Sequence, residues 1–147
     1  MEIYLIKNDS QLWEKMIGFA RECSWRAGMA LADKMEKNDF QDWERVIVAV
    51  DNDSIAGYCT IAEKDELPDD YSYSPFIGFM FVDEKYRGKR ISGQMINCAT
   101  DYAKGLGYNK VFIMSGEHGL YEKYGFEKLG DFETIYGETD QLFEKVL

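Results

Sequence analysis

A short basic segment at 82–96, VDEKYRGKRISGQMI, carries the residue types best suited to binding an anion. It is net positive in a chain of formal net charge −10 because of four basic side chains, Lys85, Arg87, Lys89 and Arg90. An apolar run precedes it and a helical pattern follows, and the free N–H groups and dipole of a helix N-terminus attract phosphate. Gly88 lets the backbone approach such a group closely. The alternative is a solvated basic turn, which is common before helices.

Two other phosphate-binding motifs are excluded. A Walker A loop needs G-x-x-x-x-G-K-[ST], but the pair Gly88-Lys89 lacks the upstream glycine and a following Ser or Thr. A dinucleotide fingerprint needs G-x-G-x-x-G, and the segment 88–93 has only its first and last residues as glycine.

The elements around this segment predict a β-loop-α-β unit over 76–114. PFIGFMFV (75–82) is apolar without alternation, which indicates a central strand that is buried on both faces. KVFIM (110–114) is a second buried strand. A helix between them, ending near Gly105 or Gly107, places on one face Ile91, Met95, Ala99 and Tyr102. Such a unit requires parallel strands and a right-handed crossover.

The remaining pattern predicts a mixed sheet with packed helices. Ser10 is the expected N-cap of the first helix. The other expected elements are a strand at 2–6, helices at 12–23 and 27–37, a hairpin of strands 45–50 and 54–61, an acidic loop at 64–70, and two final strands joined around 137–140.

Composition predicts one folded domain of 147 residues without membrane or nucleic-acid partners. Apolar types make up 46% and charged types 30% of the chain, as in ordinary globular proteins. The acidic balance repels nucleic acid and anionic membranes. The first residues lack a secretory pattern and no apolar run could span a bilayer, so a cytoplasmic location is expected.

The cysteines and the single histidine argue against a metal site. Cys23, Cys59 and Cys98 are scattered, and His118 is the only histidine. These are too few ligands for structural zinc. Reduced and mostly buried thiols are expected.

Two motifs and the order of the elements resemble the GNAT superfamily of N-acetyltransferases. That family reads Q/R-x-x-G-x-G/A at its pyrophosphate loop, and RGKRIS (87–92) matches at Arg87, while Arg90 and Ser92 replace the glycine and the small residue. A Y-E-K-x-G-F-like motif follows one βαβ spacing later and matches YEKYGF (121–126). The resemblance covers nearly all of the chain, and CSWRAG (23–28) and TDQLFEK (139–145) resemble a bacterial subgroup.

The resemblance implies an α/β fold, a GNAT-like mixed, mostly antiparallel β-sheet with a central splayed parallel strand pair and flanking helices, as a single acetyltransferase domain over 1–147. It implies acetyl-CoA as cosubstrate, without a metal, with its pantetheine arm inserted between the splayed strands. The backbone of Phe81 and Val82 would then bind the pantetheine or the thioester. The pyrophosphate would be held by the loop and first helical turn, Arg87, Gly88, Lys89, Arg90, Ile91, Ser92 and Gly93.

The same resemblance implies that Tyr121 is the general acid. A phenol of pKa near ~10 can protonate a departing thiolate whose thiol has a pKa near ~8.5. The alternative is an aromatic side chain that only packs on the sheet. Many relatives place a glutamate on the central strand as general base, but 75–82 contains none. Glu117, beside His118, is the nearest candidate base, and a water chain is the alternative.

The expected activity is therefore N-acetyl transfer from acetyl-CoA to a primary amine by direct attack on the thioester. A non-catalytic acyl-CoA-binding regulatory domain on the same fold is the alternative, motivated by the altered glycine pattern. The acceptor is a small-molecule or peptide amine, with Trp25 and Glu138 as candidate contacts. Carboxylates near the expected acceptor cleft favour a small cationic or neutral amine over an anionic one. A homodimer is compatible with the sequence.

Overall fold

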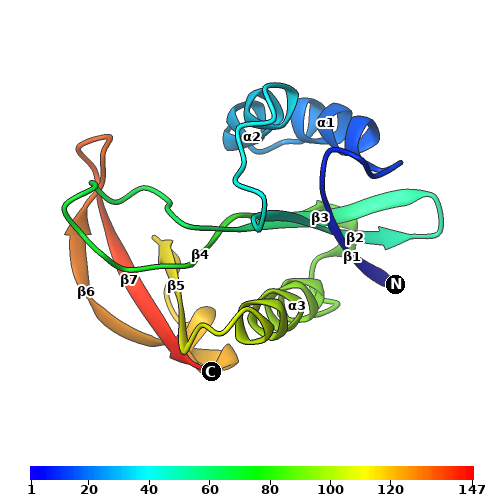
Figure 1. Ribbon diagram of the computed structural model, residues 1–147. Coiled ribbons are helices and arrows are strands. Elements are labelled where there is room, and N and C mark those ends of the chain that lie inside the picture. The colour runs from blue at the N-terminus through cyan, green and yellow to red at the C-terminus, as the bar shows by residue number, and fades with distance from the viewer.

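Seven strands form one continuous sheet in the computed structural model, which describes residues 1–147 (Figure 1). Their order is β1-β2-β3-β4-β5-β7-β6. All neighbours are antiparallel except β4 and β5, which are parallel. The strands are β1 (Glu2–Ile6), β2 (Arg45–Asp51), β3 (Ser54–Ala62), β4 (Phe76–Val82), β5 (Lys110–Ser115), β6 (Glu127–Glu133) and β7 (Thr139–Val146).

Three helices cover the two faces of the sheet. The helices α1 (Trp13–Glu22) and α2 (Ala27–Glu36) pack together on one face, and α3 (Ile91–Gly105) lies on the other (Figure 1). Two short 3₁₀ segments, η1 (Glu84–Tyr86) and η2 (Tyr121–Tyr124), follow β4 and β5. None of the helices combines the length and apolar character needed to cross a bilayer.

The helices form because their apolar residues recur at helical spacing and are buried against the sheet. In α3 the buried stripe includes Ile91, Met95, Ala99 and Ala103, which are four residues apart and so share one face. These residues belong to a core with the inward side chains of β2, β3 and β5. A second core on the opposite face joins α1 and α2 to alternate residues of β2 and β3.

The structure confirms the predicted fold class and the parallel unit over 76–114. One boundary differs. Helix α1 begins at Trp13, without a side-chain cap, and Ser10 is not its N-cap. The Ser10 hydroxyl instead accepts a hydrogen bond from Leu12 N–H at 3.1 Å. The serine therefore stabilises a turn before the helix, a common competitor of true capping.

Candidate active site

The sheet opens between β4 and β5. The two strands are paired only where Phe76 meets Phe112, and Pro75 O accepts the Phe112 N–H there at 3.0 Å. In Figure 1 the half of the sheet formed by β1–β4 and the half formed by β5–β7 diverge from this point. Beyond it, the edge of β4 that faces β5 has no strand partner. This is the splayed pair that the resemblance to the GNAT superfamily implies.

A bulge in β4 helps to turn the strand away from its neighbour. The register with β3 shifts between Tyr58 and Thr60, and Phe79 in β4 has φ +49. An extra residue in one strand bends it and increases its twist. The bulge thus supports a separation that a regular parallel pair would close.

Backbone alternation distinguishes the two residues expected at the exposed edge. Asp83 N–H donates to Ala56 O of the β3 side at 2.8 Å, and alternate residues of a strand direct their backbone groups to the same side. The groups of Phe81 are therefore directed toward β3. Those of Val82 are directed toward the gap, which leaves Val82 as the backbone candidate.

The loop after β4 leads into the N-terminus of α3. Gly88 has φ +81 and Arg90, the residue before the helix, has φ +62. Left-handed backbone suits glycine and costs other residues about 1 kcal/mol or more. Arg90 stands where the family motif has a glycine, and its backbone is left-handed. A glycine would adopt this conformation freely, whereas arginine adopts it at an energetic cost. The Arg90 side chain is exposed, so its charge remains available at the loop.

The first turn of α3 has unpaired backbone donors. Gln94 N–H donates to Arg90 O at 3.2 Å, whereas the preceding N–H groups, those of Ile91, Ser92 and Gly93, have no acceptor within the helix. No side chain caps this end. The donors and the helix dipole make the turn a suitable binding site for a phosphate group.

The arginine and lysine side chains of the loop are exposed. Arg87 Nε donates to Val82 O at 3.0 Å, which links the loop to the exposed edge of β4. The Arg87 guanidinium also lies 5.9 Å from the centre of the Phe81 ring. Lys89 lies 5.5 Å from the centre of the Tyr86 ring. The predicted pyrophosphate loop is thus adjacent to the gap and positively charged.

Tyr124 connects the second motif to this turn. Its hydroxyl lies 3.0 Å from Ser92 Oγ, and a Cβ added at Gly93 would lie 2.8 Å from its Cε1 atom. Gly93 is predicted from the family resemblance only as a cofactor contact. The structure adds a packing reason for a glycine at this position.

Tyr121 is buried beneath the sheet, with only 4% of its surface exposed. Its ring packs on Phe126 and Phe143 at centroid distances of 6.1 and 5.8 Å. Burial raises the pKa of its hydroxyl to about 12, and Cys59 and Glu117 act in the same direction, while a hydrogen bond with Ser115 opposes them. Both roles expected for Tyr121 remain compatible with this position, because the ring packs and the hydroxyl retains its proton.

The candidate base Glu117 lies in the exposed loop after β5. Its side chain is exposed, as is that of His118. The loop backbone is held by Gln141, whose amide donates to Glu117 O at 2.8 Å. Glu117 influences the pKa of Tyr121, so the two residues belong to one region, but the carboxylate itself is directed to solvent.

Trp25 lies in an aromatic cluster over β3 and β4. Its ring stacks on Phe81 at 6.1 Å and also contacts Tyr58 and Phe79. A cavity of about 340 Å³ borders this cluster and is lined by the end of α1, the start of the α1–α2 connection and the end of β4. Three acidic residues, Glu22, Asp83 and Glu84, are among its lining residues.

Glu138, the other predicted acceptor contact, belongs to a separate acidic group. The other members of this group, Asp65, Glu66 and Asp140, are not among the predicted site residues. The charge of Glu138 helps to raise the pKa of Glu66 to about 7, although burial is the larger cause, and Asp65 and Asp140 act in the same direction. Burial likewise raises the pKa of Asp65 to about 6. The loop 64–70 meets the β6–β7 turn where Ile135 N–H donates to Glu66 O at 2.8 Å.

Asp65 lies beside the gap, and the sequence pattern does not single it out. The pattern indicates only an acidic loop at 64–70 and an apolar strand that contains Gly78. The structure places the Asp65 carboxylate over Gly78 of β4, since a Cβ added at Gly78 would lie 2.9 Å from Asp65 Oδ1. A glycine in the middle of a buried strand is the signal that could have indicated a close approach.

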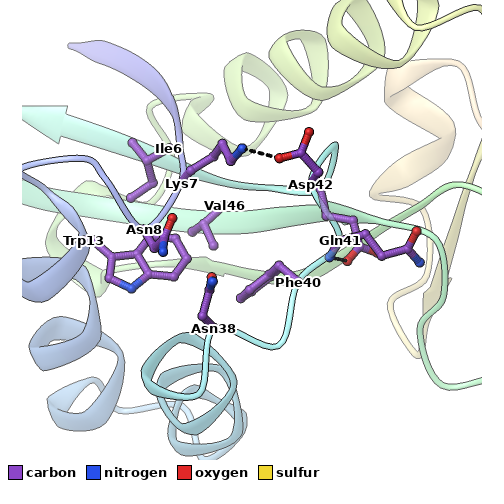
Figure 2. A pocket seen from close by; sticks show the side chains of 10 residues that line it. Ile6, Lys7, Asn8, Trp13, Asn38, Phe40, Gln41, Asp42 and Val46 are labelled. Carbon is purple, nitrogen blue, oxygen red and sulfur yellow. Dashed lines mark hydrogen bonds and ion pairs between the residues drawn. The ribbon is translucent and has the colours of Figure 1, made fainter.

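A second cavity lies away from the gap, at the β1–β2 edge (Figure 2). It measures about 220 Å³ and is lined by Trp13, Phe40 and polar residues of the α2–β2 connection. Figure 2 shows Lys7 and Asp42 at its rim, joined by an ion pair of 2.8 Å. It contains none of the predicted site residues.

The family model of the acetyltransferase (GNAT) family matches residues 11–126. No curated protein matches the sequence. Among solved structures, aminoglycoside 6'-acetyltransferase type Ii is similar with a TM-score of 0.77 and 16% identity, over 99% of this chain and 97% of that chain. The aminoglycoside 6'-N-acetyltransferase from Enterococcus faecium has a TM-score of 0.75 and 14% identity, over 99% and 97%.

A GNAT family acetyltransferase from Elizabethkingia anophelis, solved with acetyl-CoA bound, is similar with a TM-score of 0.69 and 18% identity, over 99% of this chain and 97% of that chain. At these identities the likeness shows a shared fold. The family model adds the sequence evidence, because it includes β4, the basic loop, α3 and the YEKYGF segment. The protein belongs to the acetyltransferase (GNAT) family.

Proposed function

We propose that the protein transfers an acetyl group from acetyl-CoA to a primary amine by direct attack of the amine on the thioester. One observation carries this proposal. The edge of β4 that lacks a partner leads, through a positively charged loop, to the unpaired N–H groups of α3. A long ligand with a hydrogen-bonding arm and a pyrophosphate fits such an arrangement.

The proposed binding roles follow from position. Val82 would pair through its backbone with the pantetheine arm, as a strand pairs with an exposed edge. Ile91, Ser92 and Gly93 would donate their N–H groups to the pyrophosphate. Arg87 and Arg90 would add charge-assisted hydrogen bonds, which are about twice as strong as neutral ones.

Acetyl-CoA supplies an activated acyl carbon when bound. The chain would direct an N–H group of the open β4 edge at the thioester oxygen, where negative charge develops during attack. Tyr121 would give its proton to the departing sulfur. Burial raises the pKa of the phenol to about 12, so it holds this proton throughout the neutral range, and donation to the sulfur requires that the two groups are positioned together in the transition state.

The same features favour catalysis over a regulatory acyl-CoA-binding domain. Solved structures of similar fold carry the name acetyltransferase. The structure also accommodates the altered motif, since Arg90 adopts the left-handed backbone that the glycine would provide. The altered glycine pattern, which motivated the regulatory alternative, is thus compatible with a loop that binds pyrophosphate.

We also propose that the acceptor is a small cationic amine. Four carboxylates gather where the loop 64–70 meets the β6–β7 turn, those of Asp65, Glu66, Glu138 and Asp140. Such a field attracts positive charge. Similar structures carry the name aminoglycoside acetyltransferase, and aminoglycosides are polycationic, so they belong in the first acceptor panel.

The test is thiol release from acetyl-CoA with a panel of aminoglycosides, polyamines, amino acids and peptide N-termini. Release that depends on an amine, with an acetylated product seen by mass spectrometry, is the expected result. Coenzyme A binding by calorimetry without amine-dependent release would favour the regulatory alternative. A preferred acceptor of net negative charge would refute the acceptor class while leaving acetyl transfer intact.

A further inference from the structure

We propose that Asp65 is the general base that removes the proton from the attacking amine. This inference rests on the proposed acetyl transfer and assigns the base to Asp65 in place of Glu117, whose side chain is exposed. The base expected on the central strand is absent, and the structure brings a carboxylate to that strand from a neighbouring loop instead.

The position of Asp65 follows from two small features of the sheet. A Cβ at Gly78 would lie 2.9 Å from Asp65 Oδ1 and 3.3 Å from Thr60 Oγ1, so the carboxylate fills the space that a side chain at 78 would occupy. Gly78 lies two residues past Phe76, the last point at which β4 and β5 are paired. Asp65 is therefore placed at the mouth of the opening between the strands.

The carboxylate also lies on the acceptor side of the sheet. Thr60 pairs with Gly78. It lies two residues from Tyr58 in β3, so the two side chains point to the same face of the sheet, and the Tyr58 ring belongs to the core under α1 and α2. Lys34 of α2 is close enough to act on the pKa of Asp65. The face opposite α3 is the one that carries Trp25 and its aromatic cluster, so an amine that approaches the gap from this face would do so on the side that carries Asp65.

The surroundings of Asp65 raise its pKa toward the neutral range, where a general base works well. Burial raises its pKa to about 6, Asp140 of β7 acts in the same direction, and a Glu66 backbone hydrogen bond and Lys34 oppose them. A base with a pKa just below neutral is mostly ionised at pH 7 and still accepts a proton readily. Glu66 and Glu138 complete the charges on this side.

Glu66 is the rival carboxylate, and its orientation distinguishes it. Asp140 of β7 helps to raise the pKa of Glu66, and the Glu66 backbone oxygen accepts the Ile135 N–H at 2.8 Å. Glu66 thus belongs to the contact with the β6–β7 turn, whereas Asp65 contacts β4. We assign the proton transfer to Asp65 and a supporting electrostatic role to Glu66.

Asp65 takes one proton from the ammonium, the freed nitrogen lone pair forms the C–N bond, and the C–S bond breaks. The sulfur receives a proton from Tyr121, and the second proton lost by the nitrogen restores the phenol through solvent. Asp65 returns its proton to water. The products are an amide, free coenzyme A thiol and one released proton, and no oxidant or metal is consumed.

The test compares Asp65→Asn with wild type across pH, using a primary alkylamine that the wild type acetylates. We expect a rate loss of about 10²–10⁴-fold near pH 7, the contribution of a positioned base. The loss should shrink as pH approaches the pKa of the amine, about 10 for an alkylamine, because solvent has then removed the proton. Coenzyme A affinity, measured by calorimetry, should not change.

Three further variants make the result decisive. Gly78→Ala keeps the carboxylate but displaces it, so turnover should fall while circular dichroism stays native. Glu66→Gln should cost less than Asp65→Asn. Asp70→Asn, an exposed acid of the same loop, should retain wild-type turnover.

Unchanged turnover in Asp65→Asn, or a loss of equal size at every pH, would overturn the assignment to Asp65. So would a Glu66→Gln loss that exceeds it. A wild-type protein that releases no thiol with any amine would instead refute the proposed function, and this is seen before any variant is made.

Discussion

At the scale of single residues, the ring and the hydroxyl of Tyr121 can be tested separately. Its ring contributes to the core, and its hydroxyl contributes only if it meets a reacting atom. Tyr121→Phe preserves the ring, so the fold and coenzyme A affinity should survive. If the phenol is the acid, turnover should fall about 10²–10⁴-fold, as measured by thiol release under saturating amine. Tyr108→Phe, which removes a hydroxyl from a ring packed on Trp43, is the control and should be neutral. Wild-type turnover in Tyr121→Phe would leave this residue a packing role.

The charges of the basic loop allow a second prediction at this scale. Replacing Arg87 and Arg90 together by Ala should weaken coenzyme A binding by about 1–3 kcal/mol, the scale of charged hydrogen bonds, and the difference should shrink at high salt. Calorimetry at two ionic strengths measures both effects. Lys104→Ala is the matched control, because this lysine lies in the last turn of α3, far from its N-terminus. An unchanged affinity in the double variant would place the pyrophosphate elsewhere.

At the scale of elements, the junction before α3 depends on one unusual backbone conformation. Arg90 has φ +62 and ψ 27. Arg90→Gly and Arg90→Ala both remove the charge, but only glycine removes the left-handed cost. The glycine variant should therefore be the more stable one, by about 1 kcal/mol, while the two bind coenzyme A equally. Urea denaturation and calorimetry check the two parts. An alanine variant of equal or greater stability would mean that this backbone is not maintained.

Two glycines in helices, Gly18 and Gly93, should respond in opposite directions to replacement by alanine. Alanine is the better helix former by about 1 kcal/mol, and Gly18 of α1 has nothing within 4 Å of an added Cβ, so Gly18→Ala should stabilise. At Gly93 the added Cβ would lie 2.8 Å from Tyr124 Cε1. Gly93→Ala should therefore destabilise by about 1–3 kcal/mol, the usual cost of overpacking, and should also disturb the α3 N-terminus. Thermal unfolding of both variants tests the contrast; stabilisation by both would show that Tyr124 moves aside freely.

At the scale of the whole molecule, the half-buried carboxylate of Asp65 couples stability to pH. Asp65 has a raised pKa of about 6, so the folded state holds its proton more tightly than the unfolded chain. This tighter binding of the proton stabilises the folded state. The stabilisation is fully present below the unfolded pKa of about 3.9, and it is lost as pH rises through the folded pKa of about 6. Asp65→Asn should therefore be more stable than wild type at pH 8, on the order of 1–2 kcal/mol, with the difference smallest near pH 4. Urea denaturation at both values measures it. A variant less stable at pH 8 would contradict the desolvation of Asp65.

The sequence by itself determined the elements and the loop. Apolar periodicity is a local property, so β4, α3 and β5 could be placed from residues such as Ile91, Met95 and Ala99. The continuous apolar runs identified the central strands for the same reason. The charge pattern of 82–96 also needs no fold to be read. The one misplaced boundary, at Ser10, arose because a hydroxyl can bond a turn as readily as a helix end.

Only the tertiary structure decided which distant residues meet. Asp65 and Gly78 are separated by a loop, and nothing local indicates that the carboxylate lies over the glycine. The same holds for Glu66 and the β6–β7 turn, which are joined through Ile135. The pKa of a buried group depends on its surroundings after folding, so the raised values of Asp65 and Tyr121 belong to the fold. The choice between Phe81 and Val82 also depends on strand pairing, since register sets the direction of each backbone group.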